Sequence, residues 1–121
     1  MDDVDQRIAE LEKRLSEAAS EVPDIAEMLR GTVGERYVRC GKPGCHCEEG
    51  AGHGPVFFVS SSVGGRTKQV ALTPETYEVA KRYVGNYARL REIVDEVSMI
   101  NQELLQARRA KQRAEQSAGG E

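Results

Sequence analysis

Residues 39 to 55 read RCGKPGCHCEEGAGHGP and hold all three cysteines of the chain together with both of its histidines. Cysteine and histidine are side chains that bind Zn²⁺, and a structural zinc site is closed by four such ligands in a tetrahedron. The segment therefore predicts one structural zinc ion per chain. The expected ligands are Cys40, Cys45, Cys47 and His53.

The spacing of these residues suits a tight metal-binding turn. Between the first two cysteines lie Gly41, Pro43 and Gly44. The glycines permit, and the proline pre-sets, the backbone dihedral angles of a tight turn. Cys45 and Cys47 are two residues apart, so an extended backbone directs both to one side. His46 then points away, and the glycine-rich loop after it returns His53 to the site. His46 is the alternative fourth ligand, but binding by His46 requires a strained bend between two other ligands.

Two other uses of the cysteines compete with zinc. A disulfide leaves one thiol over, and nothing in the chain indicates secretion. A redox Cys-x-Cys switch, or cysteines that only pack, are the remaining alternatives. Size favours the metal, because the polar, glycine-rich stretch of residues 31 to 73 is near the limit below which a metal or disulfide replaces missing hydrophobic burial.

Composition and charge restrict the class of protein. Of 121 residues, 31% are charged, 5% are aromatic and none is tryptophan, which is typical of long solvated helices around a small core. The net charge is −3, with the acidic excess in residues 1–30 and a mild basic excess in residues 31–74. The chain lacks the strongly basic character of a dedicated nucleic-acid binder. It begins with MDDVDQR rather than a signal peptide and contains no apolar membrane span, which predicts a cytoplasmic protein.

Residues 1–22 are expected to form an N-terminal helix over about residues 2–21. Apolar residues recur there at alternating spacings of four and three, which indicates a coiled-coil seam. Three heptads are marginal in water, so this helix needs a partner helix. A single amphipathic helix on a globular body is the alternative. The seam positions are Val4, Ile8, Leu11, Leu15, Ala18 and Val22.

Residues 23–73 are expected to hold a short helix followed by the zinc-binding sheet. The short helix spans residues 24–30, and a strand over residues 32–39 leads into Cys40. Strands over 55–63 and 66–72 flank the dipeptide Gly64-Gly65, which predicts a β-hairpin. The three strands form an antiparallel sheet on which Phe57 and Phe58 face opposite sides, so one of the two rings enters the core and the other needs a cover.

Residues 74–116 are expected to form one long helix, with Thr73 as its N-cap and Pro74 at its first position. Its apolar seam includes one polar position, Asn86, which would fix the register of a coiled coil. A second stripe near the start, from Tyr77 to Tyr87, would pack on the sheet. The basic cluster of residues 108–113 suits a helix C-terminus by its dipole or binds nucleic acid, and residues 117–121 are expected to be a disordered tail. The predicted fold is α+β, with a small three-stranded antiparallel zinc-knuckle sheet flanked by the N-terminal helix and the long coiled-coil-like helix.

The strings RYVRCGKPGCHC and HGPVFF resemble an uncharacterised family of short bacterial and archaeal proteins. Its signature is roughly RCGKPxCxC followed by HGPY, and the resemblance covers about residues 31 to 105. It implies Cys40, Cys45, Cys47 and His53 as the shared polar set. The chain departs from the family at Val56, where the family generally has tyrosine. Some members are labelled transposon-related, which implies an accessory protein associated with nucleic acid.

Two functions follow from these features. The first is a zinc-stabilised, coiled-coil-bearing accessory module that dimerises and binds nucleic acid or a nucleic-acid enzyme. The second is a protein-interaction and oligomerisation module with a purely structural zinc ion. The sequence does not indicate an enzyme or a small-molecule substrate, because four protein ligands close the zinc shell. Whether the two long helices pair in one chain or between two chains stays open. The expected phosphate contacts are Arg36, Arg39, Lys42, Arg66 and Lys68.

Overall fold

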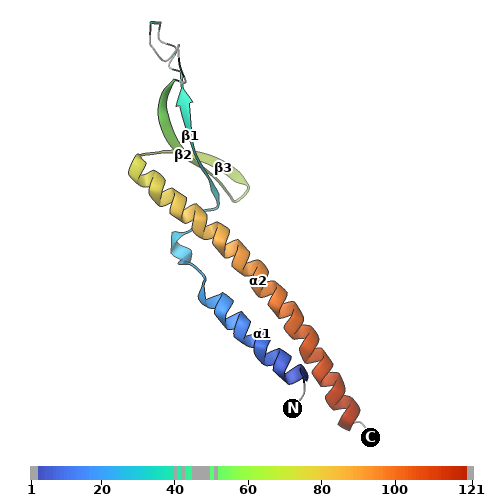
Figure 1. The fold of residues 1–121 in the computed structure, drawn as a ribbon. Coiled ribbons are helices and arrows are strands. Elements are labelled where there is room, and N and C mark those ends of the chain that lie inside the picture. The colour runs from blue at the N-terminus through green and yellow to red at the C-terminus, as the bar shows by residue number, and fades with distance from the viewer. Residues whose placement is uncertain (1–2, 40, 42, 45–49, 51, 120–121) are drawn as a thin grey trace. The chain divides into compact units, whose positions relative to one another are not determined.

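The computed structural model describes residues 3–39, 41, 43–44, 50 and 52–119. The fold is α+β, as the sequence predicts, with an N-terminal helix, a three-stranded antiparallel sheet and a long C-terminal helix (Figure 1). The chain divides into a helical unit, Met1–Pro23 with Arg89–Glu121, and a sheet unit, Asp24–Ala88. The elements are α1 Asp3–Ser20, a single 3-10 turn Ile25–Glu27, β1 Gly31–Val38, β2 His53–Val63, β3 Arg66–Leu72 and α2 Pro74–Gly119.

The β2–β3 hairpin has the turn that its sequence predicts. Gly64 and Gly65 have φ angles of 62° and 79°, which a residue with a side chain rarely adopts. Val63 pairs with Arg66 across this turn, and Val59 pairs with Val70 further along. The strand order is β1-β2-β3, so β2 is the central strand.

The pairing of β1 with β2 contains a bulge that the sequence does not reveal. Arg36 pairs with Val56 and Val38 pairs with His53, so two residues of β2 oppose the single residue Tyr37. One of those two is Gly54, which has a φ of 147°. A Cβ on Gly54 would lie 2.8 Å from the carbonyl oxygen of Arg36. This close approach of two backbones extends β2 back to His53, two residues before the predicted start at residue 55.

The pairing sorts the side chains of the sheet onto two faces, because residues alternate along a strand and cross-strand partners share a face. We call the face that carries Phe57 the inner face and the face that carries Phe58 the outer face. The inner face consists of Gly31, Val33, Glu35, Phe57, Val59, Ser61, Val63, Arg66, Lys68, Val70 and Leu72. The outer face consists of Thr32, Gly34, Arg36, Val56, Phe58, Ser60, Ser62, Thr67, Gln69 and Ala71.

The first part of α2 covers the inner face. The rings of Phe57 and Tyr77 stack with centroids 4.4 Å apart. Val59 on the sheet and Ala80 on α2 are buried, with 5% and 6% of their surface exposed. Phe57 is therefore the phenylalanine that enters the core, and Phe58 lies on the face away from α2.

Residues 24–30 form only the 3-10 turn Ile25–Glu27, where the sequence analysis expects a short helix. Beyond the Glu27–Asp24 backbone bond of this turn, the segment bonds to α2. The Leu29 amide donates to the Tyr83 carbonyl at 3.2 Å, and the Asn86 side chain donates to the Glu27 carbonyl at 2.9 Å. Asn86 thus holds this segment in place within the sheet unit.

The start of α2 has the predicted cap. Thr73 Oγ1 accepts from the Thr76 amide at 3.1 Å, and Thr76 Oγ1 accepts from the Thr73 amide at 2.8 Å. Threonine thus replaces the glutamate of a capping box. At the other end, α2 continues through residues 117–119, where the sequence analysis expects a disordered tail, because residues 110–118 are mostly good helix formers.

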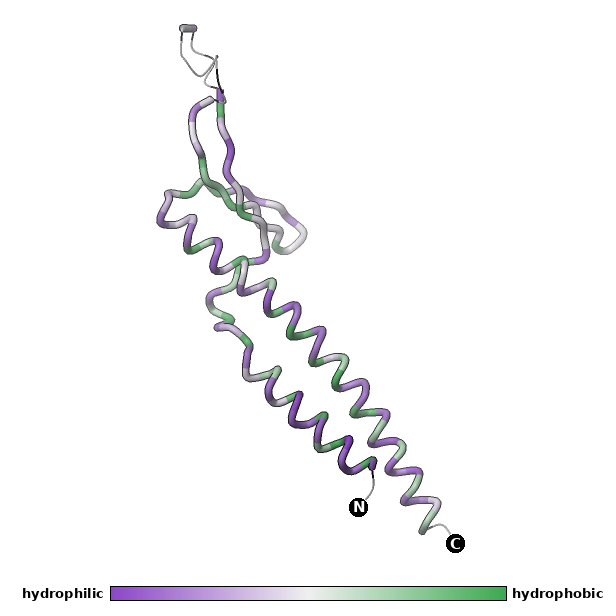
Figure 2. Tube along the Cα trace, in the orientation of Figure 1, coloured by the Kyte–Doolittle hydropathy of each residue, from purple (hydrophilic) through white to green (hydrophobic). Residues whose placement is uncertain are grey.

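In the helical unit, α1 and the second part of α2 pack side by side and antiparallel (Figure 1). Apolar and polar residues alternate along both helices (Figure 2). The apolar positions form a core of four buried residues, with Ile8, Leu15 and Val97 packed against it. The predicted seam of α1 is therefore filled by a helix of the same chain. The four core residues are Leu11, Ala18, Ile100 and Leu104.

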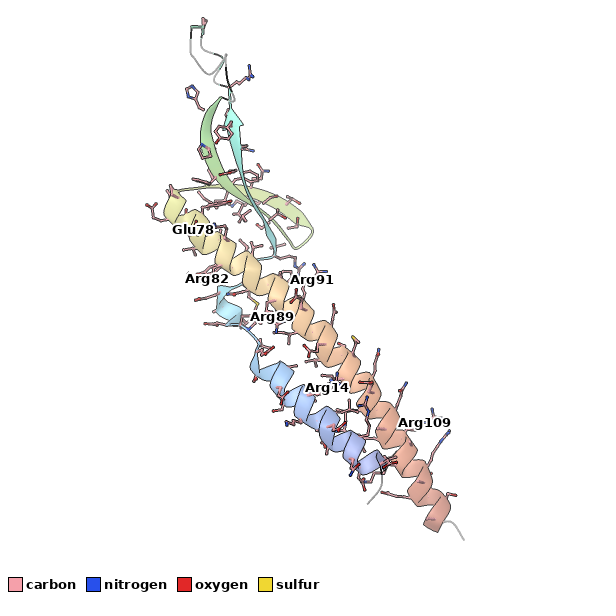
Figure 3. All side chains as sticks on the ribbon, viewed as in Figure 1. Arg14, Glu78, Arg82, Arg89, Arg91 and Arg109 are labelled. Carbon is pink, nitrogen blue, oxygen red and sulfur yellow. The ribbon has the colours of Figure 1, made fainter. Side chains whose placement is uncertain are left out.

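Ion pairs flank this core on both sides. Glu103 contacts Arg7 at 2.9 Å and Arg14 at 3.8 Å, and Arg89 contacts Glu21. Figure 3 shows Arg14 on α1 and Arg89 on α2. All these side chains are about half exposed, so the pairs orient the helices more than they stabilise them.

Candidate functional site

His53 lies at the end of the sheet that leads into the cysteine segment. It is the first residue of β2 and pairs with Val38, the last residue of β1 and two positions before Cys40. Val38 continues the alternation of β1 on the outer side, so the bulge turns its partner His53 to that side as well. Of the four predicted zinc ligands, His53 is the one among the described residues. Cys40, Cys45 and Cys47 lie outside them, as do His46 and Lys42.

Close backbone contacts hold together the two chain ends that flank the cysteines. A Cβ on Gly52 would lie 2.9 Å from the Val38 carbonyl oxygen. Arg39 Nη2 donates to the Gly50 carbonyl at 3.0 Å. The residues before Cys40 and those before His53 therefore meet at one end of the sheet. This placement fits a donor set of three sulfurs and His53, although within the described part of the chain no three His, Cys, Asp or Glu residues gather as a metal site.

The predicted phosphate contacts do not share one face. Arg36 lies on the outer face of the sheet, whereas Arg66 and Lys68 lie on the inner face. Arg39 follows β1 next to the cysteine segment, and Lys42 lies outside the described residues. Phosphate contacts from one sheet face thus involve Arg36 or the pair Arg66 and Lys68, but not all three at once.

The centre of the outer face is an aromatic ring beside a cation. The Arg36 guanidinium carbon lies 5.1 Å from the centroid of the Phe58 ring, within cation–π range. Arg36 Nη1 also donates to Gln69 Oε1 at 3.3 Å. The tip of the Phe58 ring leans over Gly34, where a Cβ would meet Phe58 Cζ at 2.8 Å. These contacts join all three strands.

Sequence reasoning did not single out Phe58 and Gln69 for this surface. The adjacent pair Phe57-Phe58 shows only that the two rings face opposite sides. The hairpin turn then places Gln69 opposite Ser60, on the face of Phe58. Because Arg36 comes from β1, its place beside Phe58 depends on a register that no local pattern in the sequence specifies.

On the inner face, charge gathers at the start of α2. Lys81 Nζ lies 3.0 Å from Glu78 Oε1 and 5.0 Å from the centroid of Tyr77. The hydrogen bond that Lys81 donates to Glu78 raises the pKa of Lys81 above its ordinary value, and the charge of Glu35 acts in the same direction. Glu78 and Arg82 project from this first part of α2 (Figure 3). The inner face thus carries both signs of charge, whereas the outer face carries Arg36 and no carboxylate.

The basic cluster near the end of α2 is partly used inside the helical unit. Arg108 pairs with Glu12 at 3.5 Å, and Lys111 pairs with Asp5 at 2.8 Å. These contacts give the cluster a structural role in joining α2 to α1.

The fold and the end of the sheet define a small α+β protein in which one long helix contributes to both a sheet unit and a helical pair. The chain belongs to the family described as a domain of unknown function, DUF6788, which matches residues 1–93. No curated protein matches the chain, and no solved structure matches it. Among the described residues, no helix combines the length and apolar character needed to cross a membrane.

Proposed function

We propose that this chain is a zinc-stabilised accessory module that binds nucleic acid. The observation that carries the proposal is the outer face of the sheet, which presents Arg36 beside a partly exposed aromatic ring and contains no Asp or Glu. A phosphate group should bind this surface better than the inner face, because on the inner face the Glu35 carboxylate, which lies close to Lys81, would repel it. Two acidic residues of α1, Asp5 and Glu12, pair with bases of α2 in the helical unit.

The zinc ion of the proposal has one structural purpose. Cys40, Cys45, Cys47 and His53 would hold one ion per chain, which closes the end of the sheet and fixes β1 against β2. Support comes from the Val38–His53 pair and from the Arg39–Gly50 hydrogen bond, which bring the flanking residues together. A shell of four protein ligands leaves no position for a substrate, so the proposal includes no enzymatic activity. Zinc binding by thiolates would require a reducing compartment, which makes the cytoplasm the expected location in this proposal.

The family resemblance agrees with this proposal. The RCGKPGCHC and HGP strings that carry it both fall within residues 1–93, the part of the chain that the family matches. The transposon-related label of some resembling proteins points to the same partners, namely nucleic acid or an enzyme that processes it. We extend that association to this chain as part of the proposal.

Binding assays at graded salt concentrations test the proposal. Labelled single-stranded and duplex DNA and RNA are titrated with the full chain, purified under reducing conditions. We expect binding at low salt that weakens as salt rises. Arg36→Gln is expected to weaken binding, and Arg66→Gln, which removes the same charge from the inner face, is the matched control. The absence of binding to every probe at low salt would overturn the proposal.

A second candidate is an oligomerisation module with the same structural zinc site and no affinity for nucleic acid. Val94 and Leu105 on α2 favour it, because they are 52% and 65% exposed and lie eleven residues apart, close to three full helical turns. They therefore share one side of the helix and would contact a second copy in a homodimer. Light scattering distinguishes this candidate: a dimer that becomes monomeric in Leu105→Gln, without nucleic-acid binding, supports it.

A further inference from the structure

We infer that the outer face of the sheet binds single-stranded nucleic acid by stacking an unpaired base on the ring of Phe58. The inference rests on the proposed function and deepens it, because it names the form of nucleic acid and the residue that contacts the base. The feature that carries it is the arrangement of Phe58, Gly34, Arg36 and Gln69 on three adjacent strands.

Phe58 differs from its neighbour Phe57 in what lies against its ring. Phe57 stacks on Tyr77 and contributes to the core of the sheet unit. Phe58 extends from the other side of β2 and leans over Gly34, its partner on β1. A Cβ at position 34 would lie 2.8 Å from the tip of the ring. Because residue 34 is a glycine, the ring can lie close to the β1 backbone. A low, partly exposed ring in the middle of a sheet offers a flat surface to a base.

Arg36 is placed to hold a nucleotide whose base lies on that ring. Its guanidinium already lies over Phe58 at 5.1 Å, and its side chain is exposed. Guanidinium groups, like aromatic rings, stack on bases, and they also bond to phosphate. Gln69 orients Arg36 through the 3.3 Å hydrogen bond. A bound nucleotide therefore finds a ring, a cation and an amide within one patch.

From Phe58 toward the hairpin turn, the outer-face side chains of β2 and the facing Thr67 are small and polar. Ser62 Oγ and Thr67 Oγ1 lie 2.9 Å apart, and Ser60 lies between Phe58 and Ser62 on the same strand face. Hydroxyl groups donate to and accept from base edges and 2′-hydroxyls. None of these side chains is large enough to shield Phe58 from a strand that crosses the sheet.

The same composition argues against duplex DNA as the ligand. Arg36 is the one basic residue among the ten of the outer face, so the face offers few phosphate contacts, and phosphate contacts supply most of the affinity of proteins for duplex DNA. The bases of a duplex are stacked on one another, so none of them is free to stack on Phe58. Unpaired bases are free to stack on Phe58, which makes a single strand the better partner.

Fluorescence anisotropy with matched oligonucleotides tests the inference on the full chain. The probes are oligothymidylate of about 12 nucleotides, a length typical of such surfaces, and an abasic strand with the same number of phosphates. We expect the abasic strand to bind about tenfold more weakly, because loss of one stacked base is worth roughly 5- to 150-fold in affinity. Equal affinity for the two strands would overturn the inference.

Two variants assign the difference to Phe58. Phe58→Leu keeps an apolar side chain but removes the aromatic ring, and it should weaken oligothymidylate binding about tenfold while leaving abasic binding unchanged. Gly34→Ala displaces the ring tip without deleting the ring, and it should act in the same direction. Lys68→Gln on the inner face is the control and should leave the ratio of the two affinities unchanged.

The outcomes separate this inference from the proposed function. Binding of both strands with no effect of Phe58→Leu leaves nucleic-acid binding intact but overturns the stacking site. Failure of every strand to bind overturns both. If Phe58→Leu does not fold, Gly34→Ala still tests the stacking site. This variant is expected to fold, because the three atoms nearest its Cβ all belong to the Phe58 ring, which can shift.

Discussion

The helical unit and the sheet unit differ in how much apolar surface each one buries. In the helical unit, Leu11 and Ile100 have no exposed surface and Leu104 has 1%. In the sheet unit, the buried apolar residues among those described are Val59 and Ala80, a valine and an alanine. The helical unit buries three large side chains completely or almost so, whereas in the sheet unit only a valine and an alanine are buried to that degree, beside the stacked rings of Phe57 and Tyr77. So small a core indicates that the sheet unit gains from a further stabilising element, and a metal bound by the four predicted ligands at its end would supply one.

Removal of the metal should affect the two units most unequally. Structural zinc contributes about 10–16 kcal/mol to the folding of small domains, so Cys45→Ser or a chelator should unfold the sheet unit and spare the helical unit. Amide hydrogen exchange measures this as lost protection in β2 with protection in α1 retained.

Metal content per chain serves as the control for that experiment. One zinc ion per chain is expected in the wild type and in His46→Ala, and none in Cys45→Ser. Unchanged protection of β2 after chelation would contradict the assignment of a structural metal to the sheet unit.

A cavity in the helical core should destabilise the helical unit and spare the sheet unit. Ile100→Ala removes a fully buried side chain and is expected to destabilise the helical unit by about 2–5 kcal/mol. Protection in α1 should fall while that in β2 does not. Met99→Ala is the matched control, because Met99 is the preceding residue and is 66% exposed. Equal effects of the two substitutions would refute the packing described for α1 and α2.

A side chain at Gly54 should weaken the sheet unit alone. Gly54 has a φ of 147° and lies against the Arg36 carbonyl, so Gly54→Ala is expected to destabilise the sheet unit by about 1–3 kcal/mol. The measurement is the midpoint of unfolding followed through β2. Gly50→Ala provides the comparison, since a Cβ at Gly50 meets nothing within 4 Å. Equal unfolding midpoints for Gly54→Ala and Gly50→Ala would contradict the close approach of β1 to Gly54 at the bulge.

The smallest expected effect concerns the charge of Lys81. Glu78 raises the pKa of Lys81, so the protonated lysine is favoured in the folded state. The resulting stabilisation is complete below the ordinary lysine pKa of about 10.4 and is lost as pH rises through the raised value. Glu78→Gln should move the Lys81 titration, followed by NMR, to lower pH and should remove this small stabilisation at neutral pH. An identical titration in Glu75→Gln and Glu78→Gln would exclude the contact with Glu78 as the cause.

The sequence predicts those parts of the fold that local chemistry determines. The Gly64-Gly65 turn, the Thr73 cap and the seam of α1 each depend on residues a few positions apart, and the structure confirms all three. The seam, however, is the same for pairing within one chain and between two. The choice between these arrangements depends on contacts such as Arg7 with Glu103, which are 96 residues apart.

The parts that the sequence does not predict depend on close approaches between distant backbones. At the bulge, β1 passes close enough to Gly54 to exclude a Cβ. The segment before β1 forms a 3-10 turn rather than an α-helix, and Asn86 and Tyr83 of α2 bond to it. The grouping of Arg36 with Phe58 follows from that register as well. Zinc binding by Cys40, Cys45 and Cys47 stays a prediction, because these residues lie outside the described part of the chain.

The pairing of α1 with the far end of α2 also sets the order in which a growing chain can fold. When α1 has been synthesised, its partners Ile100 and Leu104 have not, and the whole sheet unit lies between them in the sequence. A lone helix of this length is marginally stable in water. During synthesis, α1 therefore stays unpaired, with its apolar stripe exposed. The sheet unit can fold during that interval. The helical unit therefore folds last, because its core can form only after residues 100 and 104 have been synthesised.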